Sequence, residues 1–256
     1  MKDSITQTTA SNRIRRFIII GIWIVLWHFL SLRIQNDIFL PGPVSVVHSL
    51  LRMIYTTGFW LAIGHSLAKI SLGFLLGFLC AIILGGISCR IRVIREFLSP
   101  MISIIKSIPV ASFIILVLVW VNSRALSIFI SFLVTFPILY IAVLEGYDHV
   151  NLELKEMTKV YQVKAIVKLR YLYLSEILPF IISGAKVAVG MCWKAGISGE
   201  IIGLPKHSIG EQLYLSKLYL DISNLFAWTF VIVFICFAFE KVFFIILRKI
   251  EAKLLS

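Results

Sequence analysis

The sequence predicts an all-α polytopic membrane protein with about six transmembrane helices. Hydrophobic residues make up 59% of the chain, charged residues make up only 15%, and the mean hydropathy is strongly positive. Several apolar runs are long enough to cross a bilayer at about 1.5 Å per helical residue. A chain of 256 residues has room for these spans and for short connections. We expect no additional soluble catalytic domain.

The chain opens with a polar segment, residues 1–12, which we expect to be disordered and cytoplasmic. Basic residues then precede an apolar run over 17–32: Arg13, Arg15 and Arg16. This order is also typical of a signal peptide, but no small-x-small cleavage site follows the run. We therefore expect an uncleaved first span, within a single transmembrane domain over residues 13–256.

Further apolar stretches predict the remaining spans. A rigid turn, Leu40-Pro41-Gly42-Pro43, and a short amphipathic segment to about Met53 follow the first span. Four long apolar stretches and one interrupted stretch come next, at 67–88, 101–121, 126–144, 180–204 and 226–247. With the first run they give six spans.

The basic residues are divided unequally between the two sides of these spans. One side receives 15 of them: Lys2, Arg13, Arg15, Arg16, Arg90, Arg92, Arg95, Lys155, Lys159, Lys164, Lys168, Arg170, Arg248, Lys249 and Lys253. The other side receives five: Arg33, Arg52, Arg124, Lys206 and Lys217. Because cytoplasmic loops carry an excess of Lys and Arg, both termini and the loop over about 146–179 are predicted to be cytoplasmic.

The densest polar stretch lies in that loop, over residues 153–179. Its apolar residues recur at a mostly helical spacing, so it has one polar and one apolar face. One interpretation is a membrane-surface helix held by anionic lipid. The other, which we favour, is a docking element through which a cytosolic partner moves the membrane part.

Composition argues against two other classes. A net charge of +12 would suit a nucleic-acid-binding protein, but the basic residues lie beside apolar runs, so a membrane explains them better. The four cysteines and five histidines are scattered without a CxxC pair or ligand spacing. We therefore expect neither a disulfide framework nor a bound metal.

One short pattern raises the possibility of catalysis. Gly196-Ile197-Ser198-Gly199 fits the G-x-S-G pattern of intramembrane serine proteases, but the span that follows contains no histidine to act as the base. The alternative is helix packing through Gly196, Gly199 and Gly203, the last two in small-xxx-small spacing. No G-x-x-x-x-G-K-[ST] motif occurs, so an ATPase driving transport would be another polypeptide.

Ionisable residues inside the predicted spans are more informative, because such groups are costly unless they pair or line a wet cavity. Lys186, Trp193 and Glu200 are seven residues apart and share one helical stripe, and Lys194 lies deep in the same span. The stripe could line a transport path. Snorkelling of Lys186 and interhelical pairing of Glu200 are the structural alternatives.

An ordered set of motifs resembles the permease subunits of bacterial ABC importers in the nitrate/sulfonate/taurine group. The motifs are Leu40-Pro41-Gly42-Pro43; His65-Ser66-Leu67 with Lys69, Gly73, Phe74 and Gly77; Ile108-Pro109; Trp120; Phe136-Pro137-Ile138; Ser183-Gly184-Ala185-Lys186; Trp193; and Glu200. The resemblance implies a type I importer permease in the bacterial inner membrane that acts as a dimer, here expected to be a homodimer. It also implies an ATPase dimer, which uses ATP and Mg, and an extracytoplasmic binding protein. No cofactor bound by this chain is expected.

The polar stretch is similar to the family's ATPase-coupling loop, E-A-A-x3-G-x9-I-x-L-P. Glu156 holds the acidic position, Gln162 replaces the glycine and Ser175 replaces the proline, while Pro179 is kept. The resemblance assigns coupling to Glu153, Glu156, Lys159, Tyr161, Gln162 and Val163. Because glutamine resists backbone angles that glycine adopts easily, we expect either a turn at Gln162 that differs from the family's turn or an ATPase with a differently shaped groove.

The function predicted from the sequence is thus that of a permease that forms the path for a small polar or anionic solute, without being an enzyme itself. A serine protease using Ser198 and a secondary transporter are the alternatives. The latter would need inverted repeats, and we see no convincing repeat in the sequence.

Overall fold

A computed structural model describes residues 3–34, 36 and 38–255, and this part of the chain contains helices and connections but no strand. The elements, in chain order, are α1 (Asp3–Ile34), α2 (Pro43–Ile54), α3 (Thr57–Arg90), α4 (Arg92–Ser107), α5 (Val110–Val117), α6 (Ser123–Asp148), α7 (Leu152–Val160), α8 (Ala165–Val167), the π-helical segment η1 (Lys168–Leu174), α9 (Ser175–Gly203), α10 (Ile209–Leu218) and α11 (Ile222–Leu255). The predicted all-α class is confirmed.

The chain forms two compact units. Unit 1 comprises residues 1–60 and 212–231, and unit 2 comprises residues 61–211 and 232–256. Aromatic contacts join the distant segments of unit 1: the rings of Trp27 and Phe226 stack with centroids 6.0 Å apart, and Phe59 lies 5.1 Å from Trp228. Unit 2 holds the predicted docking stretch and the stripe of ionisable residues.

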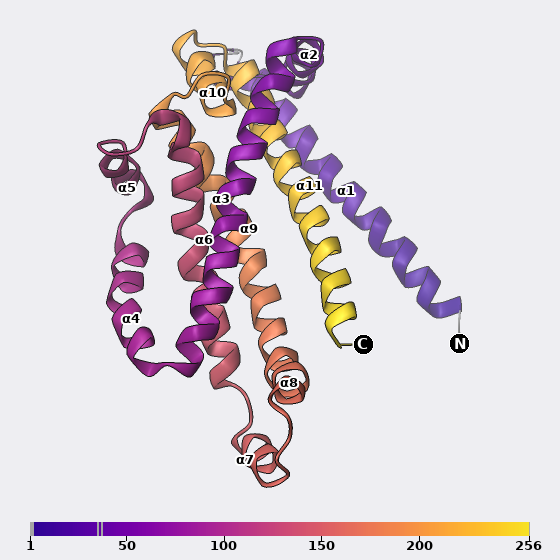
Figure 1. Ribbon diagram of the computed structural model, residues 1–256. Helices are drawn as coiled ribbons and strands as arrows, with labels where there is room; N and C mark the ends of the chain where they lie inside the picture. The colour runs from indigo at the N-terminus through magenta and orange to yellow at the C-terminus, as the bar shows by residue number, and fades with distance from the viewer. Residues whose placement is uncertain (1–2, 35, 37, 256) are drawn as a thin grey trace. The chain divides into compact units, whose positions relative to one another are not determined.

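Within unit 2, α3, α6 and α9 lie side by side (Figure 1). Glycines permit this close approach: a Cβ atom at Gly77 of α3 would lie 2.9 Å from the Cβ of Thr135 in α6. The three glycines of α9 that we assigned to helix packing differ in how closely a neighbouring helix approaches them. A Cβ at Gly203 would lie 2.5 Å from Leu126 Cδ2, and one at Gly196 would lie 2.8 Å from Ile70 Cγ1. A Cβ at Gly199 would lie 3.6 Å from Ile130 Cγ1, an ordinary van der Waals distance.

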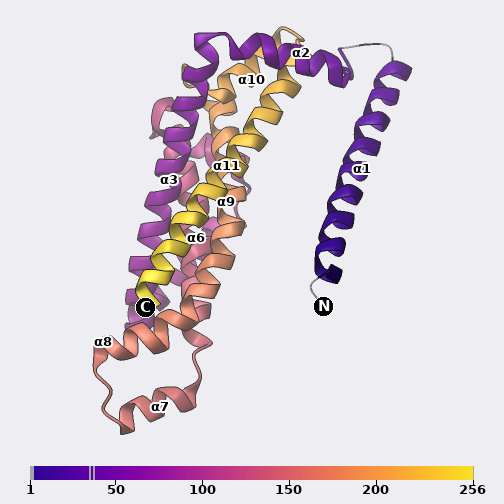
Figure 2. The ribbon, with the colours of Figure 1, turned by 90° about the vertical axis from the view of Figure 1, so that its right-hand side faces the viewer.

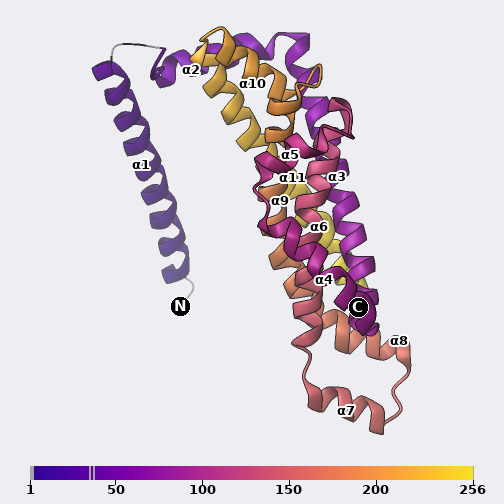
Figure 3. The ribbon, with the colours of Figure 1, turned by 90° about the vertical axis from the view of Figure 1, so that its left-hand side faces the viewer.

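The apolar run at 101–121 does not form one straight span. The helices α4 and α5 meet at an angle of 107°, as the views in Figures 1 and 3 illustrate. The break lies at Ile108, which is extended (φ −78°, ψ 129°) because the following residue is Pro109. The side chain of Val117 in α5 is buried in a cluster with Leu126 of α6 and Ala195 of α9, so this short helix packs against its neighbours.

The number of spans also differs from the six predicted. Four helices of the described residues are long and apolar enough to cross a membrane, and the bent pair gives a possible fifth. The four contain the predicted runs 67–88, 126–144 and 226–247, and the run 180–204 except for its last residue. The remaining run corresponds to Ile18–Ile34, which has only 17 residues. At ~1.5 Å per residue it extends about 26 Å, which is at the lower limit of about 17 residues for a membrane span.

The helix α1 begins at Asp3, within the polar segment 1–12 for which we predict disorder. Residues 1 and 2 lie outside the described residues. Extension of an existing helix adds one hydrogen bond for each residue that becomes ordered, which explains how a polar segment can continue the apolar helix.

The docking stretch lies at one end of unit 2. Figures 1 and 2 show α7 and α8 beyond the ends of α6 and α9, at the same end as the turn from α3 to α4 and the C-terminal end of α11. Basic residues gather at this end: Arg90, Arg92, Arg95, Arg248 and Lys249. The basic segments of unit 2 that we placed on one side of the membrane therefore lie at one end of this unit.

Candidate functional site

The helix α7 is short, polar and mostly exposed. The side chain of Asn151 caps it, with Oδ1 accepting a hydrogen bond from the backbone N–H of Glu153 at 2.8 Å. Glu153 lies in the first turn and Lys159 in the last, the arrangement that the helix dipole favours. None of the residues of α7 is buried. Burial within this chain therefore does not explain why the segment is helical.

Large apolar side chains are exposed on this polar element. Leu152 is 72% exposed, Val160 77%, Tyr161 75% and Ile166 80%. The carboxylates and lysines of α7 flank them, and Glu156 and Lys159 are themselves exposed. We call the surface formed by α7, α8 and the turn between them the docking surface. Exposed apolar side chains with a charged surround are typical of a protein interaction site.

The turn after α7 keeps the geometry that glycine usually provides, although Gln162 occupies the position. The φ of Gln162 is 47°, in the left-handed region. Its N–H donates to the carbonyl of Lys159 at 3.1 Å, and the N–H of Val163 donates to that of Thr158 at 3.1 Å. These two bonds form a Schellman motif, which ends a helix. These bonds hold Gln162 in a left-handed conformation that glycine adopts more easily.

Contacts at one end of α7 connect it to the spans. The ammonium group of Lys155 lies 4.8 Å from the centroid of the Tyr147 ring and donates to the carbonyl of that residue at 3.4 Å. Tyr147 in α6 stacks on Tyr173 in η1, with centroids 5.3 Å apart. Arg95 of α4 forms a two-point ion pair with Asp148 at the end of α6, at 3.0 and 2.6 Å. A displacement of α7 would therefore reach α6, α9 and α4.

Glu200 is completely buried, with 0% exposure. Its Oε2 accepts from Ser66 Oγ at 2.7 Å and from the backbone N–H of Gly210 at 3.2 Å. Its Oε1 accepts from Ser127 Oγ at 3.3 Å, and Ser66 Oγ in turn accepts from the N–H of Ile209 at 2.9 Å. This carboxyl group joins α3, α6, α9 and the start of α10. Hydrogen bonds from hydroxyl groups and a backbone N–H therefore hold Glu200 between these helices.

The other residues of the predicted path lie in different surroundings. Trp193 is 1% exposed, and its indole N–H has no hydrogen-bond partner among the described residues. Lys194 is exposed near the middle of α9. Lys186 is also exposed and lies in a groove facing α11. Of the three residues that share the predicted stripe, Trp193 and Glu200 are therefore buried and Lys186 is exposed.

Ser198, the nucleophile of the protease alternative, uses its hydroxyl group within its own helix. Its Oγ donates to the backbone carbonyl of Lys194 at 2.8 Å. This bond to the preceding turn is common for serine in helices and is not the hydrogen bond of an activated nucleophile to a base.

A comparison with protein families identifies the chain. Residues 73–256 match the model of the binding-protein-dependent transport system inner membrane component. The chain belongs to this family. It is therefore an inner-membrane permease component of an ABC transporter and a multi-pass membrane protein, and the predicted permease function is confirmed.

Individual relatives agree. The permease is 25% identical to a probable ABC transporter permease protein of Brucella melitensis over 201 residues, covering 78% of this chain and 80% of the relative. It is 22% identical to the nitrate import permease protein of Synechococcus elongatus, with 71% and 68% covered. It is 24% identical to the taurine transport system permease protein of Escherichia coli, with 87% and 82% covered. The resemblance to the nitrate/sulfonate/taurine group is confirmed.

Sequence reasoning missed several residues at these sites. The partners of Glu200 were not identified, although Ser66 lies in one of the motifs that carry the resemblance. The contact of Lys155 with Tyr147 and the pair of Arg95 with Asp148 were also missed. An aromatic or ionic residue at a helix end gives no sign of its partner in the sequence, because the contact depends on how two elements pack.

Replacing Gln162 with glycine should stabilise the turn after α7. A non-glycine residue in the left-handed region costs about 1 kcal/mol, so Gln162→Gly should slow hydrogen exchange of the 161–163 amides about fivefold. The matched control is Lys159→Gly, which places glycine inside the helix and should accelerate exchange by a similar factor. Faster exchange in Gln162→Gly would contradict the left-handed assignment.

Removing the acceptor at Glu200 should destabilise unit 2. The Glu200→Ala variant leaves buried hydrogen-bond donors without a partner, each costing about 1–3 kcal/mol, and should unfold at a clearly lower temperature in detergent. Glu200→Gln keeps an acceptor for Ser66 and Gly210, and its amide can donate to the Ser127 hydroxyl, so it should lose only about 1 kcal/mol. Equal melting temperatures for Glu200→Ala and the parent chain would refute this structural role.

Proposed function

We propose that the permease forms the membrane path of an ATP-driven importer and that a separate ATPase binds the docking surface. Two copies of the chain would form the path, each bound to one ATPase subunit that uses ATP and Mg, and an extracytoplasmic binding protein would deliver the solute. Membership of a binding-protein-dependent transport family supports these partners. The observation that most strongly supports this proposal is the set of exposed apolar side chains on the polar helix α7.

The contacts of the docking surface support a mechanism in which the ATPase moves the spans. Glu156 and Lys159 provide charge and Tyr161 and Val163 provide apolar contact for an ATPase groove. Closure of the ATPase dimer would displace α7. The stacked pair of Tyr147 and Tyr173 would then pass this displacement to α6 and η1. Helices that move as rigid bodies can alternate between outward-open and inward-open arrangements.

We infer the orientation from charge. The docking surface and the basic ends of α3 and α11 would face the cytoplasm, as the excess of Lys and Arg indicates. Both termini would be cytoplasmic as well. The turn between α9 and α10, next to Glu200, would then face the extracytoplasmic side.

The solute that we propose is a small anion or a small polar molecule with an anionic group. The supporting residue is Lys194, an exposed cation near the middle of α9, where an ionisable group is costly unless it meets water or an opposite charge. The names of relatives for nitrate, for aliphatic sulfonates and for taurine agree with this class. Trp193 and Glu200 would support the path from behind, because both are buried.

Replacing Glu156 with lysine should release the ATPase. A tagged chain, extracted from its own membranes in mild detergent, should co-purify with an ATPase identified by mass spectrometry. The Glu156→Lys variant should retain less than about a tenth of it, because a reversed charge at an interface opposes binding. Glu96→Lys is the matched control, an exposed carboxylate in α4 away from the docking surface. Full recovery with Glu156→Lys would refute this assignment.

Neutralising Lys194 should slow transport of an anionic solute. The ligand of the co-purified binding protein would serve as the solute in liposomes containing the complete complex. A charged hydrogen bond contributes about 1.5–3 kcal/mol, so Lys194→Gln should slow uptake by about tenfold or more, while Lys194→Arg should retain most of it. ATPase recovery should be unchanged in both. Normal uptake in Lys194→Gln would exclude this lysine from the path.

A further inference from the structure

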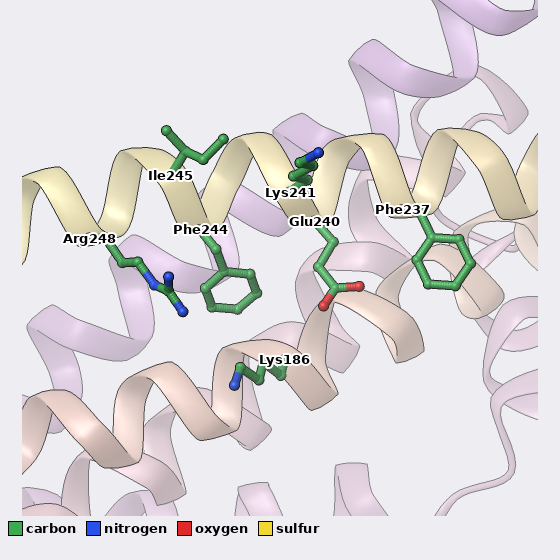
Figure 4. A pocket seen from close by; sticks show the side chains of 7 residues that line it. All are labelled: Lys186, Phe237, Glu240, Lys241, Phe244, Ile245 and Arg248. Carbon is green, nitrogen blue, oxygen red and sulfur yellow. The ribbon is translucent and has the colours of Figure 1, made fainter. Parts of the chain in front are cut away.

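A groove between α9 and α11 in unit 2 combines positive charge with apolar walls (Figure 4). Its volume is about 530 Å³, which falls within the ~300–1,000 Å³ that is usual for ligand sites. Lys186 lines it from α9. The residues from α11 lie at positions 237, 240, 241, 244, 245 and 248, a spacing that places them along one face of the helix.

The charges of this groove are unbalanced. Lys186, Lys241 and Arg248 contribute three cations, and Glu240 contributes the one carboxylate of the lining. Among the described residues, none of these three cations lies within ion-pairing distance of a carboxylate. Figure 4 shows Arg248 and Glu240 extending from α11 toward Lys186 on α9. The groove therefore retains an excess of positive charge that an anion could neutralise.

The position of the groove in the membrane suits a lipid. Arg248 immediately follows the apolar run 226–247, at the end of unit 2 where α7 and α8 lie. Lys241 lies about 10 Å deeper along the helix at ~1.5 Å per residue, and its side chain is long enough to reach toward the interface. The rings of Phe237 and Phe244 line the apolar part. Arg248 at the outer end of the groove and the rings of Phe244 and Phe237 deeper along it match the headgroup and an acyl chain of a phospholipid, and Lys241 lies between the two rings.

We propose that the groove binds an anionic phospholipid from the leaflet on the α7 side. Lys186 and Arg248 contact its phosphate, and one acyl chain packs along Phe244 and Phe237. Basic pockets between transmembrane helices bind such headgroups. Because α8, η1 and α9 form one continuous helical stretch over Ala165–Gly203, the lipid connects the helix that follows the docking surface to α11. Anionic lipid therefore stabilises this part of the permease.

The test measures lipid binding to the delipidated, detergent-purified chain by native mass spectrometry. We expect phosphatidylglycerol to bind at least tenfold more tightly than phosphatidylcholine. Each basic residue near an anionic lipid contributes about a fivefold change in affinity, so the double variant Lys186→Gln/Arg248→Gln should weaken phosphatidylglycerol binding at least tenfold. Glu240→Gln should strengthen it several-fold, because this change removes the repelling carboxylate.

Lys249→Gln is the matched control. It removes a neighbouring exposed cation of α11 that does not line the groove and should change the affinity less than twofold. Equal binding of the two lipids, or equal losses in Lys249→Gln and the double variant, would overturn the proposal. Competition by free glycerol phosphate as strong as by lipid would also overturn it, as would a double variant that lost self-association instead of lipid. The assay needs no ATPase, so its result is independent of the docking proposal.

Discussion

The burial of one carboxyl group constrains the whole of unit 2. Glu200 has no contact with solvent, so its stability depends entirely on the donors that surround it. These donors come from Ser66 in α3, Ser127 in α6 and the backbone of Gly210 at the start of α10. The chain turns between α9 and α10 through two residues with left-handed backbone, Leu204 and His207, and the hydrogen bonds to Glu200 and Ser66 offset that strain. The helices α3, α6 and α9 are thereby fixed to one another.

The docking surface, in contrast to the surroundings of Glu200, has little of its area buried within this chain. The helix α7 depends on its cap, its Schellman turn and a few contacts with Tyr147, and it remains separate from the helix block. Such an element can move without disturbing the core. It is nevertheless in direct contact with α6 through Lys155 and Tyr147. The ion pair of Arg95 with Asp148 adds a second connection, from α6 to α4. A rigid block joined to a separate contact element can transmit a partner's motion without losing its packing.

The parts of this structure that follow from local rules could be predicted from the sequence, and the parts that depend on distant contacts could not. In a membrane each backbone must satisfy its own hydrogen bonds, so apolar runs reliably become helices. The polar stretch over 153–179 was visible as a break in that pattern. The sequence could not show that Pro109 would turn the chain through 107° rather than kink one span. Nor could it show that Gln162 would adopt the angles of the glycine it replaces, or which hydroxyl groups would surround Glu200.

The bend between α4 and α5 has a consequence for biosynthesis. With 8 residues, α5 extends about 12 Å and cannot cross a hydrocarbon core of ~30 Å as an independent helix. It reaches a stable position only by packing, and its buried residue Val117 lies in a cluster that includes Ala195 of α9. The ribosome synthesises Ala195 much later than Val117. During the interval α5 lacks one wall of its site, so the packing of this segment is completed only after α9 has been synthesised.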